Sequence, residues 1–292
     1  MKYPSITELV LRDGQQSLIA TRMRLSDITP ILSKLDNVGF SSLEMWGGAT
    51  YDCCLRFLNE DPWQRLKVIK SNIKNTQLQM LLRGKNLVGY KKYDETVIDL
   101  FINKSSENGI DIFRIFDALN DINNIVYSIE CANKYNANSQ GTISYTTSPV
   151  HNEKYWLKLA KDIEDAGAKS LGIKDMAGLL KPKTAYNLIK KLKRNLSIPV
   201  HLHTHATTGL SDATNYKAYE AGVDNIDTSI SSFSNLYAHT ATESLITMIY
   251  DENDNPFNMT ELAEISDYFQ NIRNKYSCLL YTSPSPRYSL SS

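Results

Sequence analysis

Apolar stretches of strand length alternate eight times with segments of helical periodicity, and this alternation constrains the fold more than any other feature of the chain. Such an alternation is typical of a parallel sheet whose faces are covered by helices. Eight units favour a closed TIM (β/α)8 barrel, an α/β fold, over the alternative of an open doubly wound sheet. We predict strands at 7–13, 42–46, 77–83, 110–116, 141–145, 170–175, 199–205 and 225–230, and helices at 28–38, 55–73, 97–108, 122–129, 155–166, 182–194, 214–221 and 242–250, of which the one at 55–73 is interrupted by Pro62.

Composition limits the classes of protein to which the chain can belong. The 292 residues suit one barrel, and 42% of them are hydrophobic, which is enough for a large core. The 32 basic and 32 acidic side chains balance, so no general attraction to nucleic acid or membrane surfaces is expected. The four cysteines match neither a disulfide framework nor a zinc knuckle. Since no long apolar run or signal-peptide pattern is present either, we expect a cytoplasmic protein.

Polar side chains collect where the predicted strands end. Asp13 closes the first strand, Arg83 the third and Lys174 the sixth, while His203 and His205 lie at the end of the seventh. In a TIM barrel these strand ends meet at one mouth, and that mouth carries the active site. Each of these residues taken alone could have a purely structural role, such as that of a carboxylate that caps a helix. Their shared location favours a functional site.

The triplet His203-Thr204-His205 gives this site a chemistry. Side chains two apart on a strand point to the same side, so the two imidazoles project together. Two imidazoles at this spacing suit one divalent transition metal. The alternative is a polar strand end whose histidines are satisfied by hydrogen bonds.

Seven longer motifs run in order along the chain. They read LRDGQQS at 11–17, EMWGGATYD at 44–52, RFLNEDPW at 56–63, MLLRG at 80–84, FRIFD at 113–117, IKDMAG at 173–178 and HTH at 203–205. Together they resemble the carboxyltransferase domain of biotin-dependent enzymes, a family that includes the alpha subunit of oxaloacetate decarboxylase, the small carboxyltransferase subunit of transcarboxylase, and pyruvate carboxylase. The amino-acid sequences of residues 20–24 and 205–209 favour the decarboxylase and transcarboxylase branches of this family.

The resemblance implies a divalent metal held by Asp13, Lys174, His203 and His205. An ammonium group cannot bind a cation, so the neutral amine of Lys174 is expected to take up CO2 and become an anionic carbamate. The apolar run before Lys174 favours the neutral amine. One carboxylate, one carbamate and two imidazoles suit zinc, with manganese or cobalt as alternatives. The second implied cofactor is biotin, supplied by a carrier domain outside this chain.

The resemblance also assigns a substrate pocket. Arg83 matches the arginine that holds the keto-acid carboxylate, for which a bidentate contact is suitable. Arg12 and Gln16 match residues beside the keto acid, and Asp52 and Tyr90 match partners of that arginine near the biotin ring. The implied reaction is metal-dependent carboxyl transfer between oxaloacetate or pyruvate and biotin, in which Lys174 and Arg83 are catalytic. The direction of transfer stays open.

The implied partners are a small keto acid and a biotin carrier protein or domain. We expect a homo-oligomer and no nucleic-acid partner. For the decarboxylase branch, the resemblance adds a peripheral position on the inner membrane through partner subunits.

The chain departs from the family in two places. Gly14-Gln15 replaces the usual Ala-His, although neither position supplies a metal ligand. Residues 277–292 are rich in Ser and Pro and differ from the family's helical segment, whose hydroxyl group moves a proton between biotin and substrate. We predict a carboxyltransferase barrel domain at 1–276, with only the start of a C-terminal helical extension, and a disordered, non-native tail at 277–292. The alternative functions are an inactive truncated carboxyltransferase fragment and a metal-dependent aldolase-type lyase of the same barrel superfamily.

Overall fold

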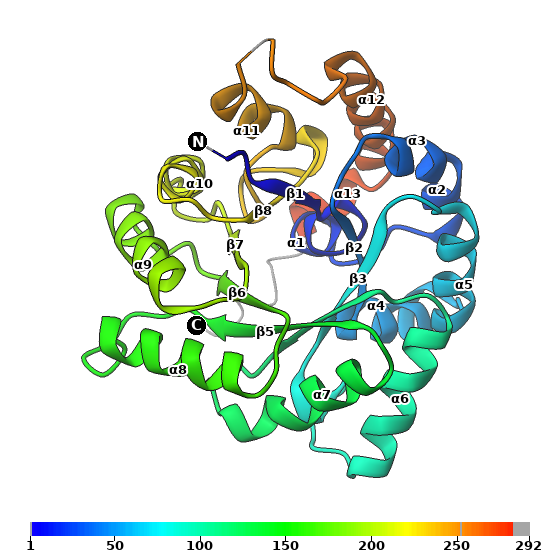
Figure 1. Ribbon diagram of the computed structural model, residues 1–292. Helices are drawn as coiled ribbons and strands as arrows, with labels where there is room; N and C mark the ends of the chain where they lie inside the picture. The colour runs from blue at the N-terminus through cyan, green and yellow to red at the C-terminus, as the bar shows by residue number, and fades with distance from the viewer. Residues whose placement is uncertain (1, 252, 283–292) are drawn as a thin grey trace.

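A computed structural model describes residues 2–251 and 253–282. Its parallel strands close into a barrel in which each strand pairs with the next along the chain and the last pairs with the first (Figure 1). The strands are β1 (Ser5–Glu8), β2 (Ser42–Gly47), β3 (Gln77–Leu82), β4 (Ile112–Phe116), β5 (Asn138–Ser144), β6 (Ser170–Asp175), β7 (Val200–Thr204) and β8 (Asn225–Thr228). The predicted TIM barrel is confirmed.

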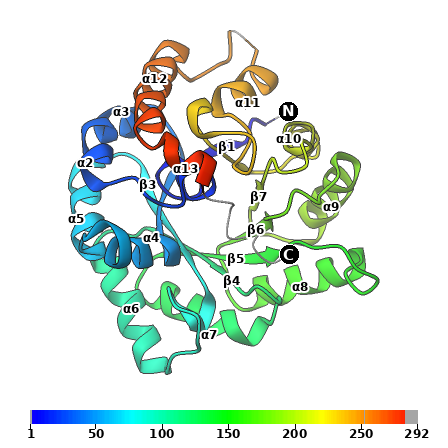
Figure 2. The same ribbon diagram turned by 180° about the vertical axis from the view of Figure 1, so that it is seen from behind.

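Helices surround the barrel in both views (Figures 1 and 2). The larger ones are α5 (Pro62–Asn72), α6 (Glu95–Glu107), α7 (Ile122–Lys134), α8 (Glu153–Asp165), α9 (Pro182–Asn195), α10 (Ser211–Glu220), α11 (Thr242–Ile249) and α12 (Met259–Lys275). Shorter ones are α1 (Gln15–Ile19), α2 (Leu25–Ile28), α3 (Leu32–Asn37), α4 (Gly48–Cys53) and α13 (Ser277–Thr282). No helix within residues 2–251 and 253–282 is long and apolar enough to cross a membrane.

The core lies between the barrel wall and the helices. β2 and β4 are buried along their whole length, as expected for parallel strands covered on both faces. In α9, Ala185, Leu188 and Ile189 form an apolar stripe on one face of the helix, and all three are buried. This two-layer packing holds the strand ends in fixed positions, so side chains at the mouth have a rigid base.

The first predicted strand is too long. β1 ends at Glu8, and Val10–Gly14 forms a π-helical turn, η1, at the place where 7–13 was predicted to be extended. The buried carboxyl group of Glu8 accepts hydrogen bonds from the backbone N–H groups of Val10 (2.9 Å) and Ile230 (3.0 Å). These bonds turn the chain away from the strand direction and join the loop after β1 to the loop after β8. π-Helical turns are rare and occur often at functional sites.

The helical segment predicted at 55–73 is interrupted before Pro62, as predicted. A π-helical segment, η3 (Cys54–Leu58), ends at Asn59, whose φ of +53° is left-handed. α5 begins at Pro62 because proline suits the first turn of a helix, and the Asp61 side chain accepts the N–H groups of residues 63 and 64.

The C-terminal segment differs from the prediction of disorder from residue 277. Residues 277–282 form α13, which packs against α1, the helix that follows Asp13. The prediction failed here because Leu279 and Leu280 pack on the hydrophobic core despite the Ser-rich composition around them. The remainder of the predicted tail, 283–292, lies outside the described residues.

Glu8 makes the stability of the fold depend on pH. Burial raises the pKa of Glu8 from 4.5 to about 8, so the folded protein keeps a proton that the unfolded chain loses above pH 4.5. This contribution to stability is complete below pH 4.5 and is lost as the pH rises towards 8.

We therefore expect E8Q, which stays neutral, to remove much of the decline in the free energy of unfolding between pH 5 and pH 8. The decline attributable to Glu8 is at most about 1.4 kcal/mol per pH unit. Urea denaturation of both proteins at several pH values measures the difference. Parallel pH profiles would show that Glu8 does not hold this proton.

Candidate active site and metal centre

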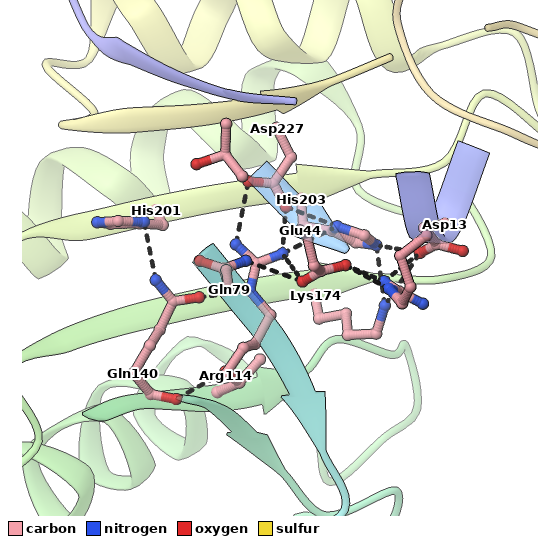
Figure 3. Close-up of polar contacts among 12 residues, drawn as sticks. Asp13, Glu44, Gln79, Arg114, Gln140, Lys174, His201, His203 and Asp227 are labelled. Atoms are coloured by element: carbon pink, nitrogen blue, oxygen red, sulfur yellow. Dashed lines mark hydrogen bonds and ion pairs between the residues drawn. The ribbon is translucent and has the colours of Figure 1, made fainter. Parts of the chain in front are cut away.

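The mouth at the C-terminal strand ends brings four predicted site residues together: Asp13 from η1, Lys174 from β6, His203 from β7 and His205 just after β7. The Asp13 Oδ2 atom lies 3.2 Å from His203 Nε2, 3.3 Å from His205 Nε2 and 3.6 Å from Lys174 Nζ. All four side chains are buried. Figure 3 shows Asp13, Lys174 and His203 converging. One carboxylate oxygen is therefore the common neighbour of the other three groups.

The structure adds His239 to this group, a residue that the sequence prediction missed. Its Nε2 atom lies 3.5 Å from Asp13 Oδ2. Asp13, His203, His205 and His239 each offer one ligand atom, and these four atoms lie within 4.8 Å of one another. His239 follows β8 in an irregular loop and belongs to no spaced motif. The signal in the sequence was only its place after the eighth strand, at the mouth where the other residues gather.

The three imidazoles are oriented in the same way. Each has an acceptor oxygen at Nδ1: Asp227 Oδ2 at 2.7 Å from His203, the Tyr237 carbonyl at 2.7 Å from His205, and the Thr204 carbonyl at 2.8 Å from His239. These oxygens assign the proton to Nδ1 in each ring, which leaves the Nε2 lone pair available. Such outer contacts are the usual means by which proteins orient metal-binding histidines.

A network of charges fills the barrel below the site (Figure 3). Asp227 accepts hydrogen bonds from both terminal nitrogens of Arg114. Arg114 Nη1 also lies 3.1 Å from Glu44 Oε2. Glu44 accepts hydrogen bonds from the guanidinium of Arg12 and from Gln79 Nε2 (2.8 Å). The contact that orients His203 is thus held by paired charges on β2, β4 and β8.

Protonation states follow from these surroundings. Burial by itself raises the pKa of Asp13, but the neighbouring guanidinium of Arg12 and the nitrogen side chains that face the carboxylate outweigh it and lower that pKa well below its usual range. Burial, together with the positive charge of Lys174, lowers the pKa of His203 from 6.5 to about 4. At neutral pH the site therefore contains a carboxylate anion and a neutral imidazole, the forms that bind a cation.

Lys174 links this cluster to a neighbouring cavity. Its Nζ atom lies 2.9 Å from His203 Nε2, and its side chain also lines a cavity of about 180 Å³. Arg12, Gln16 and Arg83 line the same cavity. The cluster and the cavity are therefore two parts of one site.

Arg83 is held at the edge of the cavity by the loop that follows β3. Its Nη1 atom donates to the carbonyls of Val88 (3.1 Å) and Gly89 (3.2 Å), and its guanidinium lies 4.7 Å from the ring centre of Tyr90. Gly48 provides the space, since a Cβ atom there would lie 2.6 Å from Arg83 Nη1. The predicted partnership of Arg83 with Tyr90 is thus present as a ring contact.

The predicted partnership of Arg83 with Asp52 does not form in the part of the chain that the structure describes. Asp52 instead pairs with Arg56, with 2.6 Å between Oδ1 and Nε. Asp52 and Arg56 are four residues apart, the spacing at which opposite charges meet on a helix, so Asp52 has a partner close to it in the sequence.

Comparison with known proteins connects this geometry to a family. A family model described as HMGL-like matches residues 4–269. The chain belongs to the HMGL-like family. It is 50% identical over 275 residues to a pyruvate carboxylase subunit from Methanocaldococcus jannaschii, covering 94% of this chain and 48% of that protein. It is 48% identical over 277 residues to the methylmalonyl-CoA carboxyltransferase 5S subunit of Propionibacterium freudenreichii subsp. shermanii, covering 93% and 54%.

A solved structure shows the same likeness to this HMGL-like chain. The carboxyltransferase domain of Rhizobium etli pyruvate carboxylase, determined with oxamate and biotin, superposes with a TM-score of 0.92 at 39% identity and covers 98% of this chain and 50% of that one. The resemblance to biotin-dependent carboxyltransferases is confirmed by these relatives. The chain spans about half the length of the curated relatives it matches.

Substitution of Asp227 tests whether its contact with His203 in this HMGL-like barrel prepares the ring for a metal. We expect D227N to weaken the binding of Zn²⁺ by about 10–100-fold, since an amide holds the ring tautomer less firmly than a carboxylate does. Isothermal titration calorimetry on metal-free protein measures the affinity.

A matched control is D36N, which removes another buried carboxylate. Asp36 accepts backbone N–H groups of residues 74–76 just before β3, at the opposite end of the barrel. D36N should bind Zn²⁺ as the parent protein does, even if it unfolds more easily. An unchanged affinity in D227N would show that the Asp227 contact does not prepare His203 for a metal.

Proposed function

We propose that this barrel carries out metal-dependent carboxyl transfer between a small keto acid, oxaloacetate or pyruvate, and biotin on a carrier domain. The observation that carries the proposal is the position of Lys174, which both lines the basic cavity and lies beside Asp13 and His203. A keto acid in this cavity has its carboxylate near arginine side chains and its carbonyl near the cluster that could hold a metal. The named relatives are carboxyltransferases and carboxylases, which supports this class of reaction.

The donor atoms fit a divalent transition metal. Asp13 is anionic, and His203 and His205 direct Nε2 lone pairs towards its carboxylate. Under the proposal these three residues hold the ion, and Lys174 adds an oxygen ligand after carboxylation of its amine. Zinc suits this donor set, with manganese and cobalt as alternatives. When bound, the ion supplies Lewis-acid polarisation of the keto carbonyl.

Arg83 and Arg12 supply the charge for the substrate. Arg83 has one terminal nitrogen engaged by loop carbonyls, which fixes the plane of its guanidinium for a carboxylate contact. Arg12 is buried, is held by Glu44 and lies 3.3 Å from Gln16 Oε1 through Nη1. Its fixed positive charge stabilises the negative charge that develops on the substrate in the transition state. A cavity of about 180 Å³ suits a small acid, since pockets for larger ligands are about 300–1,000 Å³.

The proposed transfer conserves atoms and charge. Oxaloacetate loses its terminal carboxyl group, and the electron pair of the broken carbon–carbon bond remains on the enolate of pyruvate. A ring nitrogen of biotin gives up its proton and forms the new carbon–nitrogen bond, and the enolate carbon takes up a proton. Carboxylation of pyruvate is the reverse of these steps and uses the same residues.

The proposal extends to the surroundings of the barrel. Residues 1–276 form the carboxyltransferase domain, in which α12 begins a helical extension after the barrel. A carrier protein or domain delivers biotin to the mouth, and the working form is a homo-oligomer in the cytoplasm. In the decarboxylase branch, partner subunits add a contact with the membrane.

The role of Arg83 is tested with R83K. Lysine keeps the charge but lacks the fork that holds a carboxylate through two parallel bonds, so we expect biotin-dependent decarboxylation of oxaloacetate to fall at least about 10²-fold. The control R56K changes an exposed arginine of the same mouth that pairs with Asp52, and its rate should match the parent protein.

The assay follows pyruvate formed from oxaloacetate with and without free biotin, and calorimetry follows oxalate binding. Oxalate binding without biotin-dependent turnover in the parent protein would favour the inactive-fragment alternative. Cleavage of oxaloacetate at the same rate with and without biotin would favour the lyase alternative. Equal rates for R83K and R56K would contradict the role of Arg83.

A further inference from the structure

We propose that His239 is a ligand of the metal, so that three imidazoles and one carboxylate complete its protein coordination. This inference rests on the proposed metal-dependent function and goes beyond it, because the ligand set implied by the family resemblance does not include His239. His239 is fully buried in the loop between β8 and α11. Its ring packs against His203 and His205, with centroids 4.6 Å and 4.2 Å away.

Four of the six distances between the donor atoms have the size of a tetrahedron's edges, and all four atoms lie within 4.8 Å of one another. Ligands bound at about 2.0–2.1 Å to a tetrahedral Zn²⁺ lie about 3.3–3.4 Å from one another. Here Asp13 Oδ2 lies 3.2 Å from His203 Nε2, 3.3 Å from His205 Nε2 and 3.5 Å from His239 Nε2, and the first two histidines are 3.3 Å apart. The four atoms therefore already surround a space of the right size for one ion.

The Nε2 atom of His239 is buried and makes no hydrogen bond among the described residues. Such an unsatisfied ring nitrogen is rare inside a protein. The Nδ1 atom is engaged by the Thr204 carbonyl, so the proton belongs on that side of the ring. The unprotonated Nε2 faces the Asp13 carboxylate, another acceptor, and two acceptors at this separation repel unless a cation lies between them.

The loop geometry holds His239 in this position without help from the metal. The N–H group of Ala206 donates to the carbonyl of Ala238 at 2.8 Å, and His239 itself donates to Thr204. The loop after β8 is thereby fastened to the end of β7, which carries the other two histidines. A ligand on such a support is in place before the ion arrives, which lowers the entropy lost on binding.

One consequence concerns Lys174. If His239 supplies the fourth donor, the ion is retained without a carbamate, and carboxylation of Lys174 adds a further ligand rather than completing the site. Metal binding should then persist in buffer freed of CO2, and bicarbonate should strengthen it rather than be required for it.

The test uses Co²⁺, whose visible spectrum reports coordination geometry, and two substitutions of His239. H239N keeps a nitrogen near the Nδ1 position for the Thr204 carbonyl but removes Nε2, whereas H239Q places an amide near the Nε2 position. The control is H201N, because His201 lies deeper in the barrel and contacts Gln140 at 2.8 Å rather than the cluster. Thermal unfolding of the metal-free proteins shows whether each variant folds.

We expect H239N to weaken Co²⁺ binding at least about tenfold and to change the visible spectrum, since even outer contacts of metal ligands are worth about 10–100-fold. H239Q should fall between H239N and the parent protein, and H201N should match the parent. Parent affinity and spectrum in H239N would overturn the assignment of His239 alone. A parent protein that binds no Co²⁺ would overturn both this inference and the metal-dependent function.

Discussion

The carboxylate of Asp13 is the group on which the whole site depends. A buried carboxylate is costly unless opposite charges and hydrogen bonds surround it. Here Arg12 lies 3.0 Å away, Lys174 3.6 Å away, and three imidazole Nε2 atoms face the same oxygen. The π-helical turn after β1 places this carboxylate beside the three histidines, and Glu8 fastens that turn to the loop after β8. The residues that hold the turn therefore hold the site.

The interior of this barrel carries paired charges where apolar layers are more usual. The buried carboxylates of Asp13, Glu44 and Asp227 are paired with the buried guanidinium groups of Arg12 and Arg114, and the amine of Lys174 lies beside Asp13. Removal of one partner leaves an uncompensated buried charge, which typically costs about 3–5 kcal/mol. Each functional side chain is therefore positioned by a charged partner, and that partner is positioned by the next one in the network.

Much of this arrangement could be predicted from the sequence because it depends on local periodicity. Eight strand–helix units implied the barrel, and the barrel rule placed Asp13, Arg83, Lys174 and His203 at one mouth. What escaped prediction depends on contacts between distant parts of the chain. His239 lies in an irregular loop without a motif and reaches the site only because that loop is fastened to β7. The turn at Val10–Gly14 reads as a strand until the buried Glu8 is known to accept its N–H groups.

The measurement that tests the central claim most directly is a crystal structure of the protein soaked with Co²⁺ and oxalate, with data collected at the cobalt absorption edge. The account predicts one anomalous peak about 2.0–2.3 Å from the Asp13 carboxylate and the histidine Nε2 atoms, with oxalate between the ion and Arg83. An ion bound elsewhere, or oxalate bound away from both Arg83 and the ion, would contradict the account.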